Sequence, residues 1–268
     1  MRNLIINADD YAMDDGVDAA IIELAGKGPV TAASAMVLSP RWSDAARATR
    51  DAPQISWGLH LDLTSHYAHE SGFGQSLPSL VFRANAGLLN RESICVTVDK
   101  QLSLFEERMG SAPCFVDGHQ HVHHLPIVRD VILNALSERY GAGKAAVGFR
   151  ICLSQRWRGL KAAIIGGTGA RTLRAMAEAG RHGINTDFAG VYDFAANAEL
   201  PALWGRWLSR LSGRMPLIMC HVAKASSEYP SWDAIREARL REFDWLSSDE
   251  FRSFLARNYA EPARWPRV

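Results

Sequence analysis

The feature of this sequence that most limits its fold is a repeated order of segments, in which a short apolar run is followed by polar residues and then by a helical pattern. The first unit has an apolar run at residues 4–6, then Asp9 and Asp10, then apolar residues at helical spacing through residues 17–24. A short apolar run that ends in polar residues fits a buried parallel strand. Repeated strand and helix units predict the α/β class and, within it, a TIM-like (β/α) barrel.

The same order recurs along the chain, with further strands expected at residues 32–38, 55–63, 114–116, 147–151 and 217–220. A chain of 268 residues, 47% of them hydrophobic, can bury a full core, and barrels of this size fold as one domain. We therefore expect a single domain over residues 1–268. Residues 65–89 are rich in Gly, Ser and Pro and weakly periodic, and predict a long loop that acts as a lid or faces the substrate.

Polar residues at the ends of the predicted strands are the candidates for chemistry, because catalytic groups of such barrels gather at the carboxyl ends of the strands. Asp9 and Asp10 end the first strand. Side chains alternate along a strand, so one carboxylate can bind a metal ion while the other faces a water molecule. His60 ends another strand just after Gly58, which permits a close backbone approach. Taken singly, the aspartates also fit a solvated turn, and His60 also fits a core or rim position.

A histidine-rich run follows the strand expected at residues 114–116 and contains His119, His121, His123 and His124. Alternating histidines share one face of an extended segment, and their concentration after a strand is typical of a metal or acid–base site. His119 is nearest the strand end and is the expected metal ligand beside Asp10 and His60. His121 and His123 are expected to contact the substrate or to support the ligands.

Two further strand ends carry one candidate each. Arg150 could pair with a carboxylate at the rim or orient Asp9, and His221 follows the apolar run at residues 217–220, where a capped strand end is equally compatible. Four other carboxylates could contact the substrate or support the ligands, although structural roles are favoured for each: Asp62, Asp117, Asp187 and Asp193.

Charge and hydropathy exclude several classes of partner. Thirty Lys and Arg residues stand against 29 Asp and Glu, a net charge of +1, which creates no strong field for phosphate backbones or anionic lipids. We therefore expect no nucleic-acid partner. No apolar stretch approaches the ~20 residues of a transmembrane helix, and the first residues lack the apolar region of a secretory signal. The sequence predicts a cytoplasmic protein.

Taken together, these residues resemble the YdjC-like carbohydrate deacetylases, which include chitooligosaccharide deacetylases and a hopanoid-associated deacetylase. The resemblance covers almost the whole chain, and its motifs are specific as a set: Asn7-Ala8-Asp9-Asp10-Tyr11, Gly58-Leu59-His60-Leu61, Asp117-Gly118-His119-Gln120-His121-Val122-His123, Arg150 and Cys220-His221. Two positions depart from the family pattern. Tyr11 replaces the common Phe, and Val222-Ala223 replaces the Pro-Gly that often follows the late histidine.

The resemblance implies a metal-dependent hydrolase that removes an acetyl group from an N-acetylated sugar or glycolipid. On this analogy Asp10, His60 and His119 bind one divalent ion, Asp9 is the base and His221 is the acid. The family points to Mg²⁺, while the ligand set also suits Zn²⁺. Family members often pair, so a homodimer is compatible with the resemblance.

Two other functions fit the same residues. A metal-dependent phosphoesterase would also gather His and Asp at strand ends, usually with ligands for a second ion and cationic clamps for the phosphate. A catalytically inactive sugar-binding protein would bind ligand and release no acetate. The sequence leaves open the identity of the sugar and of the metal, the oligomeric state, and the role of residues 65–89.

Overall fold

A curled parallel sheet forms the centre of the molecule. The computed structural model describes residues 2–141, 147–226 and 229–266. The strands within these ranges are β1 (Arg2–Tyr11), β2 (Ala32–Ala35), β3 (Ser56–Leu61), β4 (Phe115–Gly118), β5 (Gly148–Phe149), β6 (Phe188–Ala189), β7 (Leu217–Cys220) and β8 (Ala260–Pro262). Their order is β5-β4-β3-β2-β1-β7-β6, and β8 pairs with the amino end of β1. An isolated parallel bridge joins Phe149 of β5 to Ile184, which precedes β6 in the chain.

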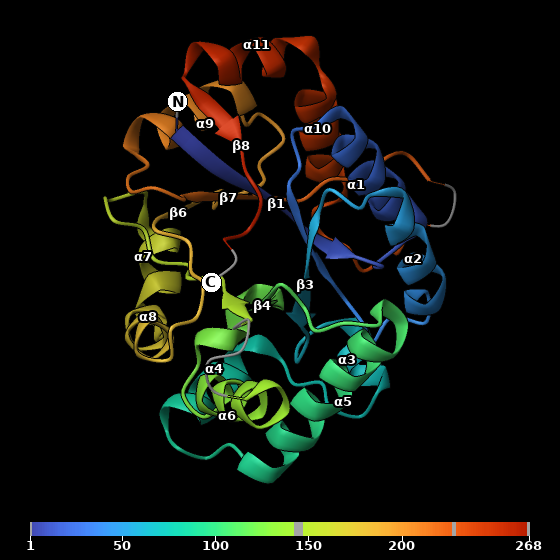
Figure 1. The fold of residues 1–268 in the computed structure, drawn as a ribbon, viewed down its shortest axis with the longest axis vertical. Coiled ribbons are helices and arrows are strands. Elements are labelled where there is room, and N and C mark those ends of the chain that lie inside the picture. Colours follow the sequence, from blue (N-terminus) through green and yellow to red (C-terminus); the bar gives the residue numbers. More distant parts are fainter. Residues whose placement is uncertain (1, 142–146, 227–228, 267–268) are drawn as a thin grey trace.

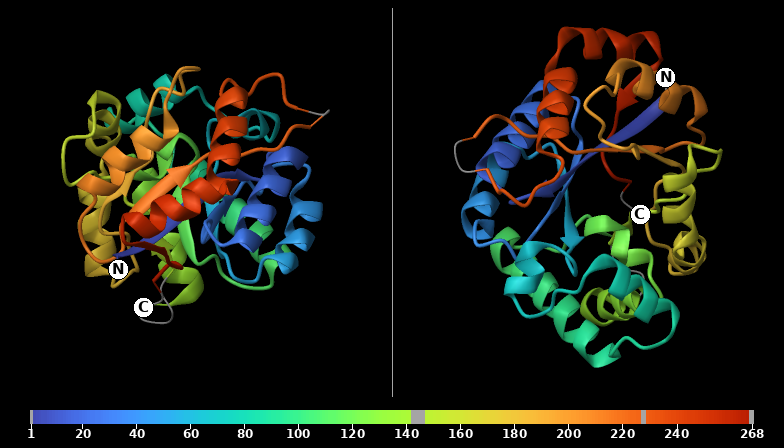
Figure 2. Two further views of the ribbon diagram at one scale, coloured as in Figure 1. Left: turned by 90° about the horizontal axis from the view of Figure 1, so that it is seen from above. Right: turned by 180° about the vertical axis from the view of Figure 1, so that it is seen from behind.

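Helices surround this sheet, so the predicted α/β barrel is confirmed (Figure 1, Figure 2). The described helices are α1 (Asp15–Lys27), α2 (Trp42–Ala48), η1 (Thr49–Asp51), α3 (His66–Glu70), α4 (Leu77–Asn85), α5 (Arg91–Met109), η2 (His119–His124), α6 (Val128–Tyr140), α7 (Leu160–Gly167), α8 (Ala170–Ala179), α9 (Leu200–Arg210), α10 (Arg236–Ser247) and α11 (Asp249–Arg257). Helix α1 begins where the Asp14 carboxylate accepts the Val17 N–H and ends at Gly28 in the left-handed conformation. Within the described ranges no helix is both long and apolar enough to cross a bilayer.

Side-chain alternation along the strands separates an outer layer from the barrel interior. Leu4 and Ile6 pack against the helices in the larger core, whereas Ile5 belongs to a second cluster. That cluster fills the amino-terminal half of the interior with residues from several strands, among them Ile5, Ala32, Phe115, Phe188, Leu217 and Trp265. Gly58 makes room there, because a Cβ at this position would lie 2.4 Å from the Phe115 ring.

The same alternation puts polar side chains at the opposite end of the interior. Residues two or four positions beyond the apolar interior ones point the same way along each strand. Asn7 and Asp9 follow Ile5 in this manner, and Asp117 follows Phe115. The apolar half therefore supports a polar layer at the carboxyl ends of the strands, where the candidate site lies.

The prediction of a long loop over residues 65–89 was wrong in part, because this segment contains α3 and α4. Helix α3 begins where the Ser65 hydroxyl accepts the N–H groups of Tyr67 and Ala68, and Pro78 lies in the first turn of α4. Both helices are too short to produce a clear periodic pattern. Thr64, Ser65, His66 and Leu77 nevertheless line the candidate site, as a substrate-facing segment would.

Candidate active site

A cavity of about 610 Å³ opens at the carboxyl ends of β1, β3 and β7 and gathers most of the predicted site residues. Six of them line it: Asp9, Asp10, His60, His119, His121 and His221. Arg150, Asp117 and His123 are fully buried and lie behind this lining. These three therefore support the site rather than contact a molecule in the cavity.

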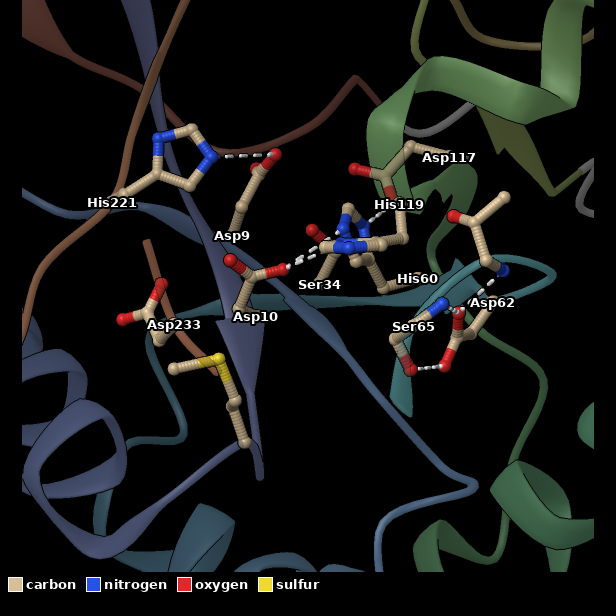
Figure 3. Close-up of polar contacts among 12 residues, drawn as sticks. Asp9, Asp10, Ser34, His60, Asp62, Ser65, Asp117, His119, His221 and Asp233 are labelled. Carbon is tan, nitrogen blue, oxygen red and sulfur yellow. Dashed lines mark hydrogen bonds and ion pairs between the residues drawn. The ribbon is translucent and has the colours of Figure 1, made fainter. Parts of the chain in front are cut away.

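Asp10, His60 and His119 converge on one point (Figure 3). The Oδ1 atom of Asp10 lies 3.3 Å from His60 Nε2 and 3.2 Å from His119 Nδ1. Ligand atoms that bind a common divalent ion at about 2.1 Å lie roughly 3.0–3.4 Å apart in octahedral or tetrahedral geometry. The three side chains therefore fit a small divalent cation. They also leave coordination positions open toward the cavity.

The backbone at Asp10 separates the two neighbouring carboxylates. Asp10 has a φ of 68°, and the pairing of β1 with β2 shifts register between Ala8 and Tyr11. Figure 3 shows the Asp9 carboxylate directed toward His221, while that of Asp10 points toward His60 and His119. A left-handed conformation at a non-glycine residue is strained, and such strain is concentrated at functional sites. The two neighbouring carboxylates therefore face different groups, and their roles as metal ligand and base remain predictions.

Asp117 sets the orientation and the protonation of His60. The Nδ1–H of His60 donates to Asp117 Oδ1 over 2.6 Å, which turns Nε2 toward Asp10. A carboxylate behind a histidine in this way is the usual support for a metal-ligating imidazole. Burial alone would lower the pKa of His60, but Asp117, Asp10 and Asp9 together raise it to about 10.

This raised pKa predicts that metal binding releases a proton. At pH 7 His60 carries a proton on Nε2 that must leave before this atom can bind a cation, so apparent metal affinity should rise up to tenfold per pH unit between pH 6 and pH 8. Calorimetric titration of chelator-treated protein in buffers of different ionisation enthalpy measures the protons released. We expect close to one proton per ion bound, and a pH-independent affinity would contradict this assignment of His60.

Arg150 holds the base candidate Asp9 from inside the barrel. Its Nη1 lies 2.5 Å from Asp9 Oδ1 and 3.1 Å from Asp117 Oδ2, and Asn7 Nδ2 also donates to Asp9 Oδ1 over 2.7 Å. Burial opposes ionisation of Asp9, but Arg150, His60 and His221 lower its pKa to about 2. Asp9 is therefore a carboxylate at any working pH, with Oδ1 occupied and Oδ2 directed toward His221.

The net negative charge of the buried centre favours the binding of a divalent cation. It joins four carboxylates to two guanidinium groups, namely Asp9, Asp10, Asp117 and Asp233 with Arg150 and Arg239. Four negative charges against two positive ones leave a net charge of −2 while the histidines are neutral. Uncompensated buried charge is costly, and a divalent ion would neutralise it. When no metal ion is bound, a protonated His60 carries one positive charge and so offsets half of this net charge.

His221 reaches the site from the end of β7, although Val222-Ala223 follow it in place of the Pro-Gly of the family pattern. Its Nε2 lies 3.9 Å from Asp9 Oδ2, and its backbone N–H donates to Glu242 Oε2 over 3.1 Å. Burial lowers the pKa of His221 to about 4, although the charge of Asp9 acts in the opposite direction. His221 is thus neutral at pH 7 and ready to receive a proton.

The histidines of η2 do not share one face, because the segment is not extended as the sequence analysis assumed. Gln120 and His121 have positive φ values of 52° and 62°, and these kinks point neighbouring histidines in different directions. His119 and His121 line the cavity, whereas His123 Nε2 donates to the Arg150 carbonyl oxygen over 2.8 Å. His123 therefore fixes the backbone of Arg150.

A second group of ligand-type side chains, His123, His124 and Cys152, lies behind the site. His124 Nε2 accepts the N–H of Cys152 over 3.2 Å, and His123 Nε2 is bonded to Arg150. Burial raises the pKa of the Cys152 thiol, so the thiolate that a metal needs is disfavoured. We therefore assign His123, His124 and Cys152 a structural role behind the cavity and not a metal site.

Arg239 and Glu242 are site residues that the sequence analysis missed. Both come from α10, one helical turn apart, and are 2% and 3% exposed. Arg239 Nη2 donates to Asp10 Oδ2 over 2.7 Å, so that only Oδ1 of Asp10 faces the histidines. Burial raises the pKa of Glu242 to about 7. One sequence pattern could have indicated these two residues. They lie at helical spacing on the buried face of α10, together with Ala238, Trp245 and Leu246, where charged side chains are unusual.

Three of the remaining carboxylate candidates have structural contacts. Asp62 accepts the backbone N–H groups of Thr64 and Ser65 at the start of the segment before α3. Asp187 forms a buried ion pair with Arg158, 2.8 Å between Nη1 and Oδ1. Asp193 accepts the N–H of Ala195. None of the three lines the cavity.

Fold and site together define an α/β barrel protein with a buried centre of carboxylates, imidazoles and guanidinium groups at the carboxyl ends of its strands. The chain belongs to the family of YdjC-like proteins, whose model matches residues 3–257. The family expected from the motifs is thereby confirmed.

Curated relatives carry deacetylase names. The chain is 30% identical over 143 residues to a chitooligosaccharide deacetylase of Escherichia fergusonii, and 32% identical over 147 residues to a carbohydrate deacetylase of Geobacillus stearothermophilus. Each alignment covers 52% of this chain and 57% of the relative, so the match spans little more than half of those proteins.

A solved structure shares the fold over nearly its full length. It is a proposed cellobiose-phosphate cleavage protein from Enterococcus faecalis V583, with a TM-score of 0.74 at 21% identity, covering 98% of this chain and 97% of that one. At this identity the likeness shows the arrangement of the barrel and its helices.

Proposed function

We propose that this protein is a metal-dependent carbohydrate deacetylase, and that residues 1–268 act as one catalytic unit that hydrolyses the acetamide of an N-acetylated sugar. The observation that carries the proposal is the convergence of Asp10, His60 and His119 beside a separately held carboxylate, Asp9, at one cavity wall. The deacetylase names of two relatives support the same chemistry.

One divalent ion, Mg²⁺ or Zn²⁺, held by Asp10, His60 and His119 would polarise the acetamide carbonyl and lower the pKa of water at the site. Asp9 then acts as the base. Its Oδ1 is occupied by Arg150 and Asn7, which leaves Oδ2 to accept a proton from the attacking water. The fixed position of this oxygen keeps the geometry of proton transfer constant.

His221 completes the proton path to the leaving group. A proton on Asp9, whose pKa is held at about 2, is readily passed on, and His221 Nε2 lies 3.9 Å from Oδ2. A neutral His221 can take this proton and deliver it to the sugar nitrogen as the C–N bond breaks. Protonation is required there, because an unprotonated amide nitrogen is a very poor leaving group.

The contacts of the cavity argue against a phosphoesterase. Of the two ligand-type groups found among the described residues, only the one with Asp10 lines the cavity. Its two strongly basic lining residues are already engaged: Arg239 bonds to Asp10 and Asp233, and Lys161 donates to the Tyr192 carbonyl oxygen over 2.9 Å. A phosphate group would meet no uncommitted cationic clamp at this wall.

The test is a comparison of two substrate classes with the same metal-loaded protein. N-acetylglucosamine and its oligosaccharides are assayed for acetate release, and sugar phosphates are assayed for phosphate release. We expect acetate and no phosphate. Phosphate release without acetate would overturn the proposal in favour of the esterase.

A further inference from the structure

Trp232 presents an aromatic surface to the same cavity. It follows β7 in the chain, lines the cavity and keeps 38% of its surface exposed. Its ring meets Tyr67 edge to face at 5.5 Å between centroids and lies 5.6 Å from the His66 ring. Tyr67 is itself fixed, because its hydroxyl donates to the Met13 carbonyl oxygen over 2.6 Å. The contact with the fixed Tyr67 ring thus limits the positions that Trp232 can take.

A chain of ion pairs ties Trp232 to the proposed metal centre. Its neighbour Asp233 bonds to Arg239, 2.9 Å from Oδ2 to Nε, and Arg239 bonds to Asp10. Tyr229 also donates its hydroxyl to Asp233 over 2.6 Å. In Figure 3, Asp233 lies on the side of Asp10 away from His60 and His119. The backbone that carries Trp232 is therefore anchored directly beside the reacting position.

A hydrogen-bonding side chain accompanies this ring in the cavity wall. Thr64 lines the cavity, and its buried hydroxyl has no hydrogen-bond partner among the described residues. A pyranose ring presents C–H groups on its faces and hydroxyl groups at its edge, so it matches an aromatic face flanked by polar groups. A cavity of 610 Å³ falls in the range of about 300–1,000 Å³ that accommodates ligands larger than a single ring.

We propose that Trp232 forms a subsite for the sugar ring next to the N-acetylated ring that reacts at Asp10, His60 and His119. The preferred substrate accordingly has at least two rings. This inference rests on the proposed function, since it takes the position of the reacting ring from it. Thr64 is available to hold a hydroxyl group of the substrate beside the aromatic face.

The experiment compares the mono-, di- and trisaccharide of N-acetylglucosamine with wild type, Trp232→Ala, Trp232→Phe and Trp157→Ala. Trp157 is the matched control, because it is 67% exposed and lines a different cavity. We expect Trp232→Ala to lower kcat/KM for the di- and trisaccharide by roughly tenfold, the effect of truncating an aromatic binding residue, and to leave the monosaccharide within about twofold. Trp232→Phe should retain part of the preference, and Trp157→Ala should change nothing.

Equal losses for all three sugars, or no loss for any, would overturn the subsite. Melting temperatures of the variants show whether the alanine variant is folded, and if it is not, the phenylalanine variant carries the comparison. Should wild type release no acetate from any sugar, the proposed function fails, and the subsite is then judged by calorimetric binding. Tighter binding of the disaccharide that Trp232→Ala abolishes would support it, and equal binding of mono- and disaccharide would refute it.

Discussion

Replacing Asp9 by asparagine should lower kcat for acetate release by on the order of 10²–10⁴-fold, the range in which a positioned general base contributes. The amide keeps the size of the side chain and can still accept from Arg150, but it cannot take a proton from water. Metal affinity should stay near the wild-type value, because Asp10, His60 and His119 are unchanged. Steady-state kinetics at saturating metal, together with calorimetric metal binding, measure both quantities.

Asp187→Asn is the matched control for this variant. Asp187 is also a buried carboxylate paired with an arginine, Arg158, but it lies outside the cavity. We expect this control to lose stability and to keep its kcat. A similar fall in kcat for both variants would mean that Asp9 acts through the packing of the barrel and not as a base.

Replacing Arg150 by methionine should reduce the free energy of unfolding by about 3–5 kcal/mol, because the change leaves buried carboxylates without their cation. Arg150 is fully buried and bonds to both Asp9 and Asp117. Its loss should also raise the pKa of Asp9, since Arg150 is the strongest of the charges that lower it. Urea denaturation at pH 7 measures the change in stability.

The comparison for this variant is Arg47→Met. Arg47 pairs with Asp44 on the surface, and the two side chains are 65% and 73% exposed. An exposed pair of this kind contributes less than about 1 kcal/mol. If Arg150→Met were no more destabilising than Arg47→Met, the buried centre would not depend on its guanidinium group.

Much of the polar layer could be predicted because it follows from strand alternation. Asp9, His60 and His221 each end a buried strand, and parallel strands bring such ends together without regard to their separation in sequence. The class of fold and the position of these candidates therefore depend only on local patterns. Their roles as ligand, base and acid remain predictions.

Other parts of the site depend on contacts that no local pattern contains. Arg239 bonds to Asp10, which lies 229 positions away in the chain. This contact forms only because α10 packs beside α1. The kinks at Gln120 and His121 likewise replace the extended segment that the histidine spacing suggested. Trp232 was one of eight tryptophans, and its place in the cavity wall becomes visible only when Tyr67 and Asp233 are positioned around it.

The most direct test of the central claim is acetate release from N-acetylglucosamine oligosaccharides by protein freed of metal with EDTA, before and after addition of one equivalent of Mg²⁺ or Zn²⁺. The account predicts no release from the stripped protein, recovery on addition of one equivalent of ion, and no recovery when Asp10 is replaced by alanine. Acetate release that persists after complete removal of metal, or that survives the loss of Asp10, would contradict a metal-dependent deacetylase.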